Sequence, residues 1–417
     1  MNRIIIDITE LTRWKGRLTG VPRTINELAN NFKNSRSVIF CEWSDNDQNL
    51  RVVSHLPNIS IDQEIEADIE KNYIKKRIKD FIRKYKLTSK VTEIIGTLKG
   101  FKKRVGKNQF GQEVNIEAGD TLIVMADWHS SDSNFIKYIK AQTLKKITLV
   151  QFAYDLLPIV APQYSGHATH YLGQYINNIY PLCDLIITIS ESTKSDIITH
   201  LKQLKVNIPT IKTIRLGDNF HFAEPIKPNS NEFLKSDIKS GDYILCVGTI
   251  EARKNHELLY YTYKLAKSRG LDLPKCLIVG RPGWHSENIL DLILNDPETK
   301  EDLLVLKNIS DNELSWLYEN CIFTIYPSFY EGWGLPVAES IAHGATCLCS
   351  LTSSMPEIAG DIIPYFNPFS SDECLNAIVN LLKPNNLKKA RESLKRYKPT
   401  SWNDTFKQVT ALINETK

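Results

Sequence analysis

The chain has 417 residues, of which 42% are hydrophobic and 24% are charged, and its formal net charge is +4. A chain of this length exceeds one ordinary hydrophobic core, so we expect two domains of about 200 residues each. The composition excludes a disordered chain, and no run of about 18 apolar residues is present that would form a transmembrane helix.

Short apolar runs alternate with helical patterns along the whole chain. The first run contains Asp7, which indicates a buried strand rather than a signal peptide. The predicted strands cover residues 4–8, 37–41, 121–125, 147–152, 185–189, 211–216, 243–247, 275–279, 303–306, 321–326 and 346–350. Repeated strand–helix–strand units predict an α/β fold with parallel sheets and helices on both faces of each sheet.

The domain boundary is predicted where this alternation stops. Residues 217–242 are rich in Pro, Asn, Ser and Lys, and we expect them to link a first domain over residues 1–220 to a second over 221–399. Two doubly wound domains would then face each other across a cleft, with ligands at the carboxyl ends of the strands. Eight cysteines fall mostly within the apolar runs, which predicts reduced core cysteines in a cytoplasmic protein.

The segment from Lys71 to Lys107 differs from the rest in charge. It holds 14 Lys and Arg residues and two acidic residues, a net +12 against +4 for the whole chain. Its apolar residues recur at helical spacing, which predicts amphipathic helices with a basic face. Such helices can form a solvated outer layer, bind nucleic acid or bind anionic lipid headgroups. We favour the membrane surface, since no nucleic-acid-binding module is evident, with these candidate contacts: Lys75, Lys76, Arg83 and Lys84.

Polar or glycine-bearing turns follow several predicted strands. Gly20 lies in a turn before a helix expected over residues 24–32, Asp155 follows the strand at 147–152, and Ser190 follows the strand at 185–189. Because these turns lie at strand ends, they are candidates for the wall of the cleft. An ordinary turn or a helix cap is the competing explanation for each of them.

Two adjacent cations mark the start of the second domain. Arg253 and Lys254 follow the strand at 243–247 and Gly248, just before a helix expected to start at about Asn255. Cations favour the other end of a helix, so this placement indicates a diphosphate site rather than helix stabilisation. Arg281 follows the next strand within a glycine turn, near the expected position of a nucleotide.

The stretch from 326 to 357 carries the strongest pattern. A strand is followed by a small-residue loop, Glu331-Gly332-Trp333-Gly334, and then by a helix that begins at Leu335 and contains Glu339. Proline at position 336 suits the first helical turn. The loop amides and the positive end of the helix dipole would converge on one point, which suits a phosphate.

These residues resemble the E-x7-E signature of the retaining, nucleotide-sugar-dependent glycosyltransferases of family 4, which have the GT-B fold. The resemblance implies that Glu331 and the amides of the following loop hold the donor sugar and that Glu339 binds the nucleotide ribose. It also places Gly20 near the donor phosphate and Ser190 at the cleft mouth. The helix at 400–417 resembles the last family helix, which returns to the first domain.

The chain departs from the family pattern at two positions. Tyr154 replaces a histidine that lies beside the transferred sugar in similar bacterial enzymes, and Thr249 replaces an arginine for which Arg253 can substitute. We expect a metal-independent, retaining hexosyltransferase with no cofactor, in which Glu331, Arg253, Lys254 and Asp155 carry catalysis.

The resemblance to bacterial mannosyl- and rhamnosyltransferases makes GDP-mannose the first donor candidate and a lipid-linked glycan, such as O-antigen or capsule, the first acceptor candidate. A GT-B epimerase or phosphorylase and a non-catalytic binding protein are the alternatives. Asp45-Asn46-Asp47 formally matches the D-x-D metal motif of another fold, but its polar surroundings indicate a solvated loop.

Overall fold

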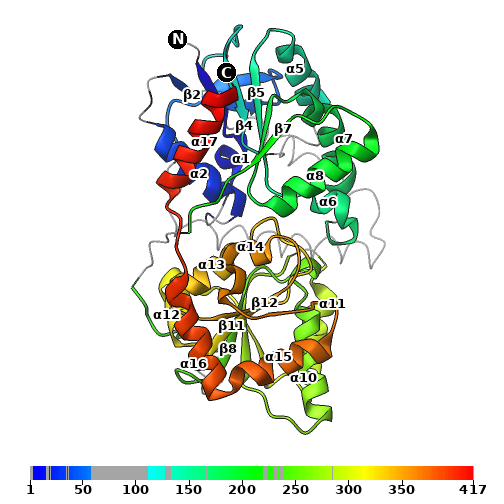
Figure 1. The fold of residues 1–417 in the computed structure, drawn as a ribbon, viewed down its shortest axis with the longest axis vertical. Helices are drawn as coiled ribbons and strands as arrows, with labels where there is room; N and C mark the ends of the chain where they lie inside the picture. The colour runs from blue at the N-terminus through cyan, green and yellow to red at the C-terminus, as the bar shows by residue number, and fades with distance from the viewer. Residues whose placement is uncertain are drawn as a thin grey trace, which may run out of the picture.

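The computed structural model describes residues 3–15, 18, 20–33, 35, 37–57, 111–126, 133–165, 168–218, 224–229, 233, 238–283 and 285–416. The predicted basic helices, with Lys75, Lys76, Arg83 and Lys84, lie outside the described residues, and no structural statement is made about them. The described residues form two α/β domains stacked along the long axis of the molecule (Figure 1).

The first domain is built on a sheet of seven described strands in the order β3-β2-β1-β4-β5-β6-β7. The strands are β1 (Ile4–Asp7), β2 (Val38–Ser44), β3 (Asn49–Val52), β4 (Thr121–Val124), β5 (Thr148–Ala153), β6 (Leu185–Thr188) and β7 (Thr210–Thr213). The helices of this domain are α1 (Thr9–Arg13), α2 (Gly20–Phe32), α5 (Ser133–Thr143), α6 (Leu157–Val160), α7 (Ala168–Ile179) and α8 (Glu191–Leu204).

The second domain is built on a parallel sheet in the order β10-β9-β8-β11-β12-β13. The strands are β8 (Tyr243–Val247), β9 (Lys275–Val279), β10 (Leu303–Leu306), β11 (Phe323–Tyr326), β12 (Cys347–Ser350) and β13 (Tyr365–Phe366). The helices are α10 (His256–Ser268), α11 (Glu287–Asn295), α12 (Asp311–Asn320), α13 (Leu335–Ala342), α14 (Met355–Ala359), α15 (Ser371–Leu382) and α16 (Pro384–Ser393).

Burial on both faces explains why the strands are continuous apolar runs. All four residues of β4, β6 and β11 are buried, as expected for parallel strands covered by helices on both sides. All eight cysteines are buried and none forms a disulfide. The predicted α/β architecture with two parallel-sheet domains is therefore confirmed.

Two strands were missing from the sequence prediction. β3 pairs antiparallel with β2, so the first sheet is not wholly parallel, and β13 is only two residues long. The hairpin between β2 and β3 turns at residues 45–48, where Gln48 has a positive φ of 52°. An edge strand in which only Leu50 is buried has a weak apolar signal.

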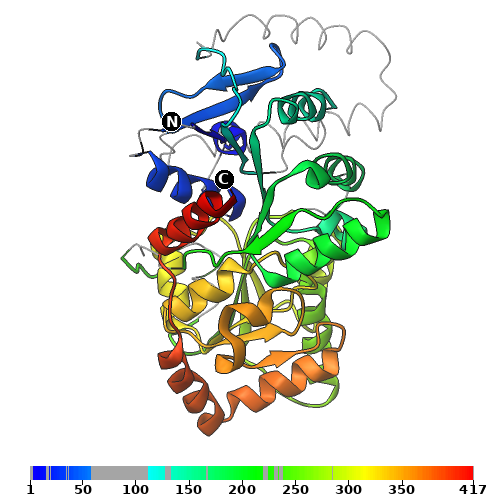
Figure 2. The ribbon, with the colours of Figure 1, turned by 45° about the horizontal axis from the view of Figure 1, so that its top comes forward.

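The last helix, α17 (Trp402–Thr416), leaves the second domain and lies beside α2 of the first (Figures 1 and 2). Phe406 packs edge-on against Phe32 of α2, with ring centroids 4.8 Å apart. One apolar cluster joins residues of both domains, including Ile6 and Phe152 of the first and Trp333 and Val337 of the second. The two domains are therefore packed against each other.

Candidate active site

The site lies where the order of the second sheet reverses. β8 and β11 are central neighbours, and the chain leaves their carboxyl ends in opposite directions, toward β9 and toward β12. Loops that diverge from such a pair leave a crevice, which is the usual ligand position in doubly wound sheets. The loop after β8 carries Arg253 and Lys254, and the loop after β11 carries Glu331.

The Glu331 carboxylate is the centre of this crevice. Arg253 Nη1 donates to its Oε2 at 2.5 Å, Lys254 Nζ to its Oε1 at 2.6 Å, and Ser328 Oγ to the same Oε1 at 2.8 Å. The Arg253 guanidinium also pairs with Glu251 at 2.7 Å. Two cations and two carboxylates thus form a chain of ion pairs from Glu251 through Arg253 and Glu331 to Lys254.

Burial and ion pairing act in opposite directions on these groups. Burial disfavours the charged form of Glu331, but the charges of Arg253 and Lys254 outweigh it and hold the pKa of the carboxyl at about 2. Burial also disfavours the charged Arg253, whereas Glu331 and Glu251 raise its pKa above the usual value. Glu331 and Arg253 are therefore both charged at neutral pH.

Serine side chains fix the loop that carries Glu331. The backbone N–H of Glu331 donates to Ser353 Oγ at 2.9 Å. Ser354 Oγ donates to the carbonyls of Glu331 and Trp333, both at 2.8 Å. Both serines follow β12, so the next strand along the sheet sets the position of the loop. This support gives the carboxylate one orientation, as catalysis by preorganised charge requires.

The amino end of α13 directly follows the loop that carries Glu331. Gly334 caps the helix with a φ of 114°, and a Cβ atom there would lie 2.8 Å from Ile358 and 2.9 Å from Met355. Only glycine fits this conformation and this space without a shift. Leu335 starts the helix, so its first amides and the positive end of its dipole face the crevice.

Glu339, one turn into α13, lies between the two domains. Its Oε1 accepts from Arg23 Nη1 of α2 at 3.3 Å, and its Oε2 accepts from the Tyr318 hydroxyl at 3.3 Å. Arg23 therefore brings a cation of the first domain to the position predicted for the nucleotide ribose. The two carboxylates of the predicted signature therefore bind different partners: Glu331 pairs with Arg253 and Lys254, whereas Glu339 contacts Arg23 and Tyr318.

The first domain closes against the Glu331 loop. A Cβ atom on Gly332 would lie 2.3 Å from the Tyr154 carbonyl oxygen and 3.1 Å from Asp155 Cβ, so these chains touch. Asp155 Oδ1 accepts from the backbone N–H of Leu157 at 3.0 Å, which is a turn-capping contact. Burial raises the pKa of Asp155, although the charge of Arg253 lowers it. Asp155 is thus brought near the cationic cluster.

The remaining predicted donor-binding residues make no side-chain contact with Glu331 among the described interactions. Gly20 is the first residue of α2, and Gly248 lies beside the Lys254 side chain. Ser190 is buried and caps α8 by accepting from the Thr193 N–H at 3.1 Å. Arg281 is exposed, while the Trp333 side chain is 5% exposed within the shared core, so only the main chain of Trp333 can face a ligand.

Tyr154, which stands where the resemblance predicts a histidine, turns its side chain into the protein interior. The side chain is buried in the apolar cluster shared by both domains, and the Tyr154 carbonyl oxygen accepts from Thr193 Oγ1 at 3.1 Å. Thr249, in contrast, is exposed. Tyr154 therefore contributes to packing, and its carbonyl supports the contact between domains.

Several contacts across the domain junction were not foreseen. The Glu357 carboxylate accepts from the backbone N–H groups of Glu191 and Ser192 at 2.7 and 2.8 Å, so it occupies the amino end of α8. The Tyr330 hydroxyl donates to Asp196 at 2.6 Å. Their sequence signal is weak because partners so far apart in the chain meet only in the folded molecule.

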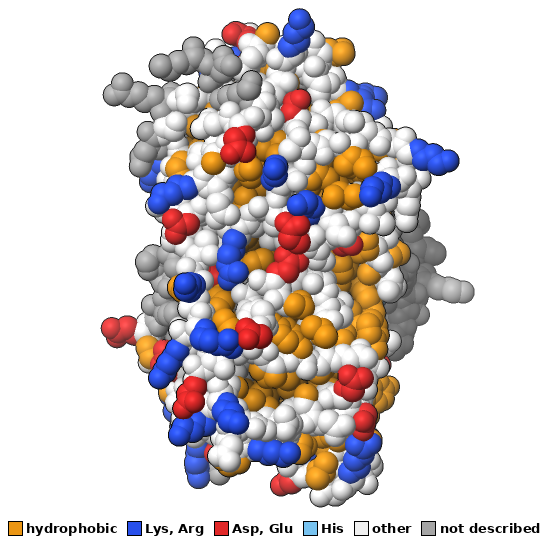
Figure 3. Space-filling model, in the orientation of Figure 1, with side chains coloured by type: hydrophobic (Ala, Val, Ile, Leu, Met, Phe, Trp, Pro, Cys, Tyr) orange, Lys and Arg blue, Asp and Glu red, His pale blue; other side chains and the backbone are white. Residues whose placement is uncertain are grey.

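The described residues hold no cluster of three or more His, Cys, Asp or Glu side chains suited to a metal ion. Asp45 pairs with Arg13 at 3.2 Å, and Asp47 pairs with Arg51 at 3.2 Å. Each aspartate thus has a cationic partner. On the face shown in Figure 3, basic and acidic side chains are interspersed over both domains. Among the described helices, none combines the length and apolar character needed to cross a bilayer.

The fold and the cluster around Glu331 define a glycosyltransferase of the GT-B class. Residues 229–400, which include the whole cluster around Glu331, match the family model described as glycosyl transferases group 1. The predicted resemblance is therefore confirmed.

Two curated relatives illustrate the similarity. O-antigen chain mannosyltransferase B of Escherichia coli is 26% identical over 262 residues, 61% of this chain and 67% of the relative. The serotype-specific mannosyltransferase WbdA of Escherichia coli is 26% identical over 258 residues, 60% of this chain and 31% of WbdA. The aligned part thus spans about a third of WbdA.

Solved structures agree on the fold. Sucrose-phosphate synthase from Thermosynechococcus elongatus superposes with a TM-score of 0.62 at 14% identity, covering 100% of this chain and 99% of that one. Anabaena HepE in complex with UDP gives a TM-score of 0.60 at 12% identity, covering 100% of both chains. At this identity the likeness concerns the GT-B fold alone.

Proposed function

We propose that this protein is a mannosyltransferase that moves mannose from a nucleotide diphosphate sugar, with GDP-mannose as the first candidate, to a growing O-antigen glycan with retention of configuration. The observation that carries the proposal is the Glu331 carboxylate held by Arg253 and Lys254 beside the amino end of α13. The mannosyltransferase names of the curated relatives support the choice of sugar and acceptor.

In this proposal the donor diphosphate binds at Arg253 and Lys254. Because Glu331 already pairs with both cations, the diphosphate competes with that carboxylate and leaves it to accept hydrogen bonds from the sugar hydroxyls. As the glycosidic bond breaks, negative charge grows on the departing diphosphate, and the two cations and the α13 dipole stabilise it. The acceptor hydroxyl attacks on the face that the diphosphate leaves, and its proton passes to a diphosphate oxygen.

Incubation with radiolabelled nucleotide sugars and a soluble mannoside acceptor tests the proposal. We expect an elongated glycoside from GDP-mannose, with an α linkage by NMR. Formation of an isomerised nucleotide sugar without an acceptor would identify an epimerase. Phosphate-dependent release of a sugar phosphate would identify a phosphorylase, and binding without any product would identify a non-catalytic protein. An inverted linkage would refute retention.

We also propose that the basic segment docks the enzyme on the cytoplasmic face of an anionic membrane, where a lipid-linked acceptor would be found. The net charge of the segment, +12, is the observation that supports this. Vesicle binding should grow with anionic lipid and weaken with salt, because exposed charges are screened over about 8 Å at physiological ionic strength. Charge-neutralising substitutions at Lys75, Lys76, Arg83 and Lys84 should release the protein. Equal binding by wild type and variant would refute the proposal.

A further inference from the structure

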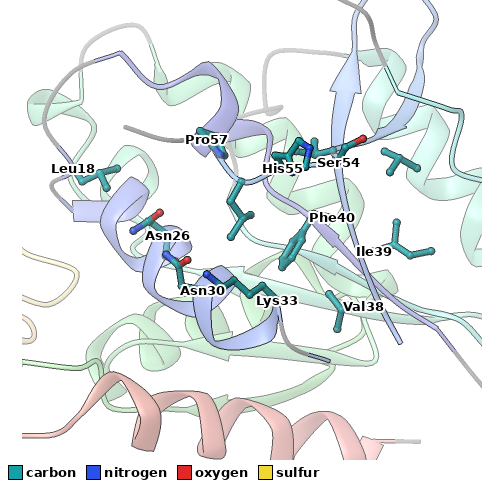
Figure 4. Close-up of a pocket in the computed structure, with 13 residues that line it drawn as sticks. Leu18, Asn26, Asn30, Lys33, Val38, Ile39, Phe40, Ser54, His55 and Pro57 are labelled. Atoms are coloured by element: carbon teal, nitrogen blue, oxygen red, sulfur yellow. The ribbon is translucent and has the colours of Figure 1, made fainter. Parts of the chain in front are cut away.

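A cavity of about 910 Å³ lies on the first domain, between α2 and β2 with the residues that follow β3 (Figure 4). Its volume is in the range of about 300–1,000 Å³ that is usual for small-molecule sites. Among the described residues, its lining combines apolar and polar groups from these elements. Those used below are Leu18, Asn26, Asn30, Lys33, Phe40 and His55.

A row of polar side chains on α2 and on Lys33, the residue directly after it, connects this cavity with the candidate active site. Arg23, Asn26, Asn30 and Lys33 follow one another at intervals of three, four and three residues, which places them on one face of the helix. Arg23 reaches Glu339 in the active site, and the other three line the cavity. At 1.5 Å per residue, the row extends about 15 Å from Arg23 to Lys33.

The cavity lining also reaches the start of α2, the end of the helix that carries Arg23. Leu18 is two residues before Gly20, the first residue of α2. A chain-like ligand that enters at Gly20 and Arg23 can therefore continue along α2 into the cavity without leaving the surface of the first domain. A donor sugar is too short to do so, whereas an oligosaccharide has the required length.

The lining suits a carbohydrate. The partly buried ring of Phe40 offers an apolar face, and the amides of Asn26 and Asn30 can each donate and accept hydrogen bonds. Within the part of the chain that the structure describes, Asn26, Lys33 and His55 have no side-chain hydrogen-bond partner. Sugars present both C–H faces and hydroxyl groups, so they match both kinds of contact.

Charge and polarity argue against other occupants. No carboxylate belongs to the described lining of the cavity, which disfavours a cationic ligand. An alkyl chain would cover Asn26, Asn30, Lys33 and His55 without replacing their hydrogen bonds to water, and burying such groups unpaired is costly.

We propose that this cavity is a distal subsite that binds the acceptor oligosaccharide behind the sugar that receives the new residue. The proposal rests on the proposed function, because it assumes an acceptor longer than one sugar. It predicts that the enzyme recognises acceptor length through α2, separately from donor recognition by the second domain.

Neighbouring asparagines on α2 provide a matched pair of variants. Asn30 Nδ2 donates to the carbonyl of Asn26 at 3.0 Å, and Asn31 Nδ2 donates to that of Glu27 at 2.8 Å. Each substitution by alanine therefore removes one similar hydrogen bond within the helix. Only Asn30 is part of the cavity lining. The double variant Asn26→Ala/Asn30→Ala removes both amides.

The test measures binding and transfer with methyl mannoside, mannotriose and mannopentaose. By calorimetry without donor, the double variant should bind mannopentaose about tenfold more weakly than wild type, and Asn31→Ala should bind it equally well. In transfer assays, the double variant should raise KM for mannopentaose, leave kcat unchanged and barely alter KM for methyl mannoside. A general folding defect would affect all acceptors alike.

Two outcomes would overturn the subsite: wild type and double variant binding mannopentaose equally, or Asn31→Ala losing as much affinity as the double variant. Transfer by wild type with no dependence on acceptor length would also reject it, while leaving the proposed function intact. Absence of transfer from any donor would instead refute the proposed function. Calorimetry would still decide whether the cavity binds oligosaccharide.

Discussion

Replacing Lys254 by methionine removes one charge of the cationic cluster while keeping the length of the side chain. Lys254 Nζ lies 2.6 Å from Glu331, and only 14% of its side chain is exposed, so solvent screens its charge weakly. Loss of one preorganised electrostatic group typically lowers kcat by about a hundredfold or more, which corresponds to about 2.7 kcal/mol. We expect a loss of this size for Lys254→Met.

The assay is the initial rate of sugar transfer at saturating donor, with circular dichroism to confirm folding. Arg253 and Ser328 still bond to Glu331 in this variant, so the loop should keep its position. Lys264→Met is the matched control, because Lys264 of α10 pairs with Asp296 at 3.1 Å and Glu298 at 2.5 Å, outside the cluster around Glu331, and its turnover should equal that of wild type. Near-normal turnover in folded Lys254→Met would refute the electrostatic role of this lysine.

Three further predictions concern the two glutamates. Glu331→Gln should bind GDP more tightly than wild type by calorimetry, because the competing carboxylate is gone, yet turn over at least about a hundredfold more slowly; weaker GDP binding would contradict competition between carboxylate and diphosphate. Glu339→Ala should raise the donor KM and leave kcat nearly unchanged, because ribose contacts are similar in the ground and transition states; a fall in kcat alone would contradict the ribose assignment. Because the pKa of Glu331 is lowered from 4.5 to about 2 in the folded protein, its contribution to stability is present above pH 4.5 and is lost as the pH falls toward 2. Thermal melting between pH 7 and 3 should therefore show a smaller acid-induced drop in Tm for Glu331→Gln than for wild type, and equal drops would refute this linkage.

Local patterns predicted the parts of the site that are contiguous in the chain. The loop from Glu331 to Leu335 combines a strand end, glycines and a helix start, and each has a distinct residue preference. Arg253 and Lys254 stood out because cations at the amino end of a helix oppose its dipole. The strand positions were likewise predictable, since strands buried on both faces are continuous apolar runs.

The interactions between these residues were not predictable in the same way. Diphosphate binding by the cations and sugar binding by Glu331 were predicted separately, whereas the structure pairs the three groups with one another. Arg23 directly precedes the helix expected over residues 24–32, but its contact with Glu339 joins residues 316 positions apart. The shared core buries the Trp333 side chain, and donor binding by the loop amide of this residue stays a prediction. Such contacts depend on how the two domains pack, which no local pattern encodes.

The contact at Gly332 sets how far the two halves of the molecule can approach. Since a Cβ atom there would lie 2.3 Å from the Tyr154 carbonyl oxygen, any side chain at this position would push the first and second domains apart. The absence of a single Cβ atom thus sets the distance between the two domains of this 47.7 kDa protein. An alanine at this position would therefore offer a chemical means to hold the two domains farther apart than in the native protein.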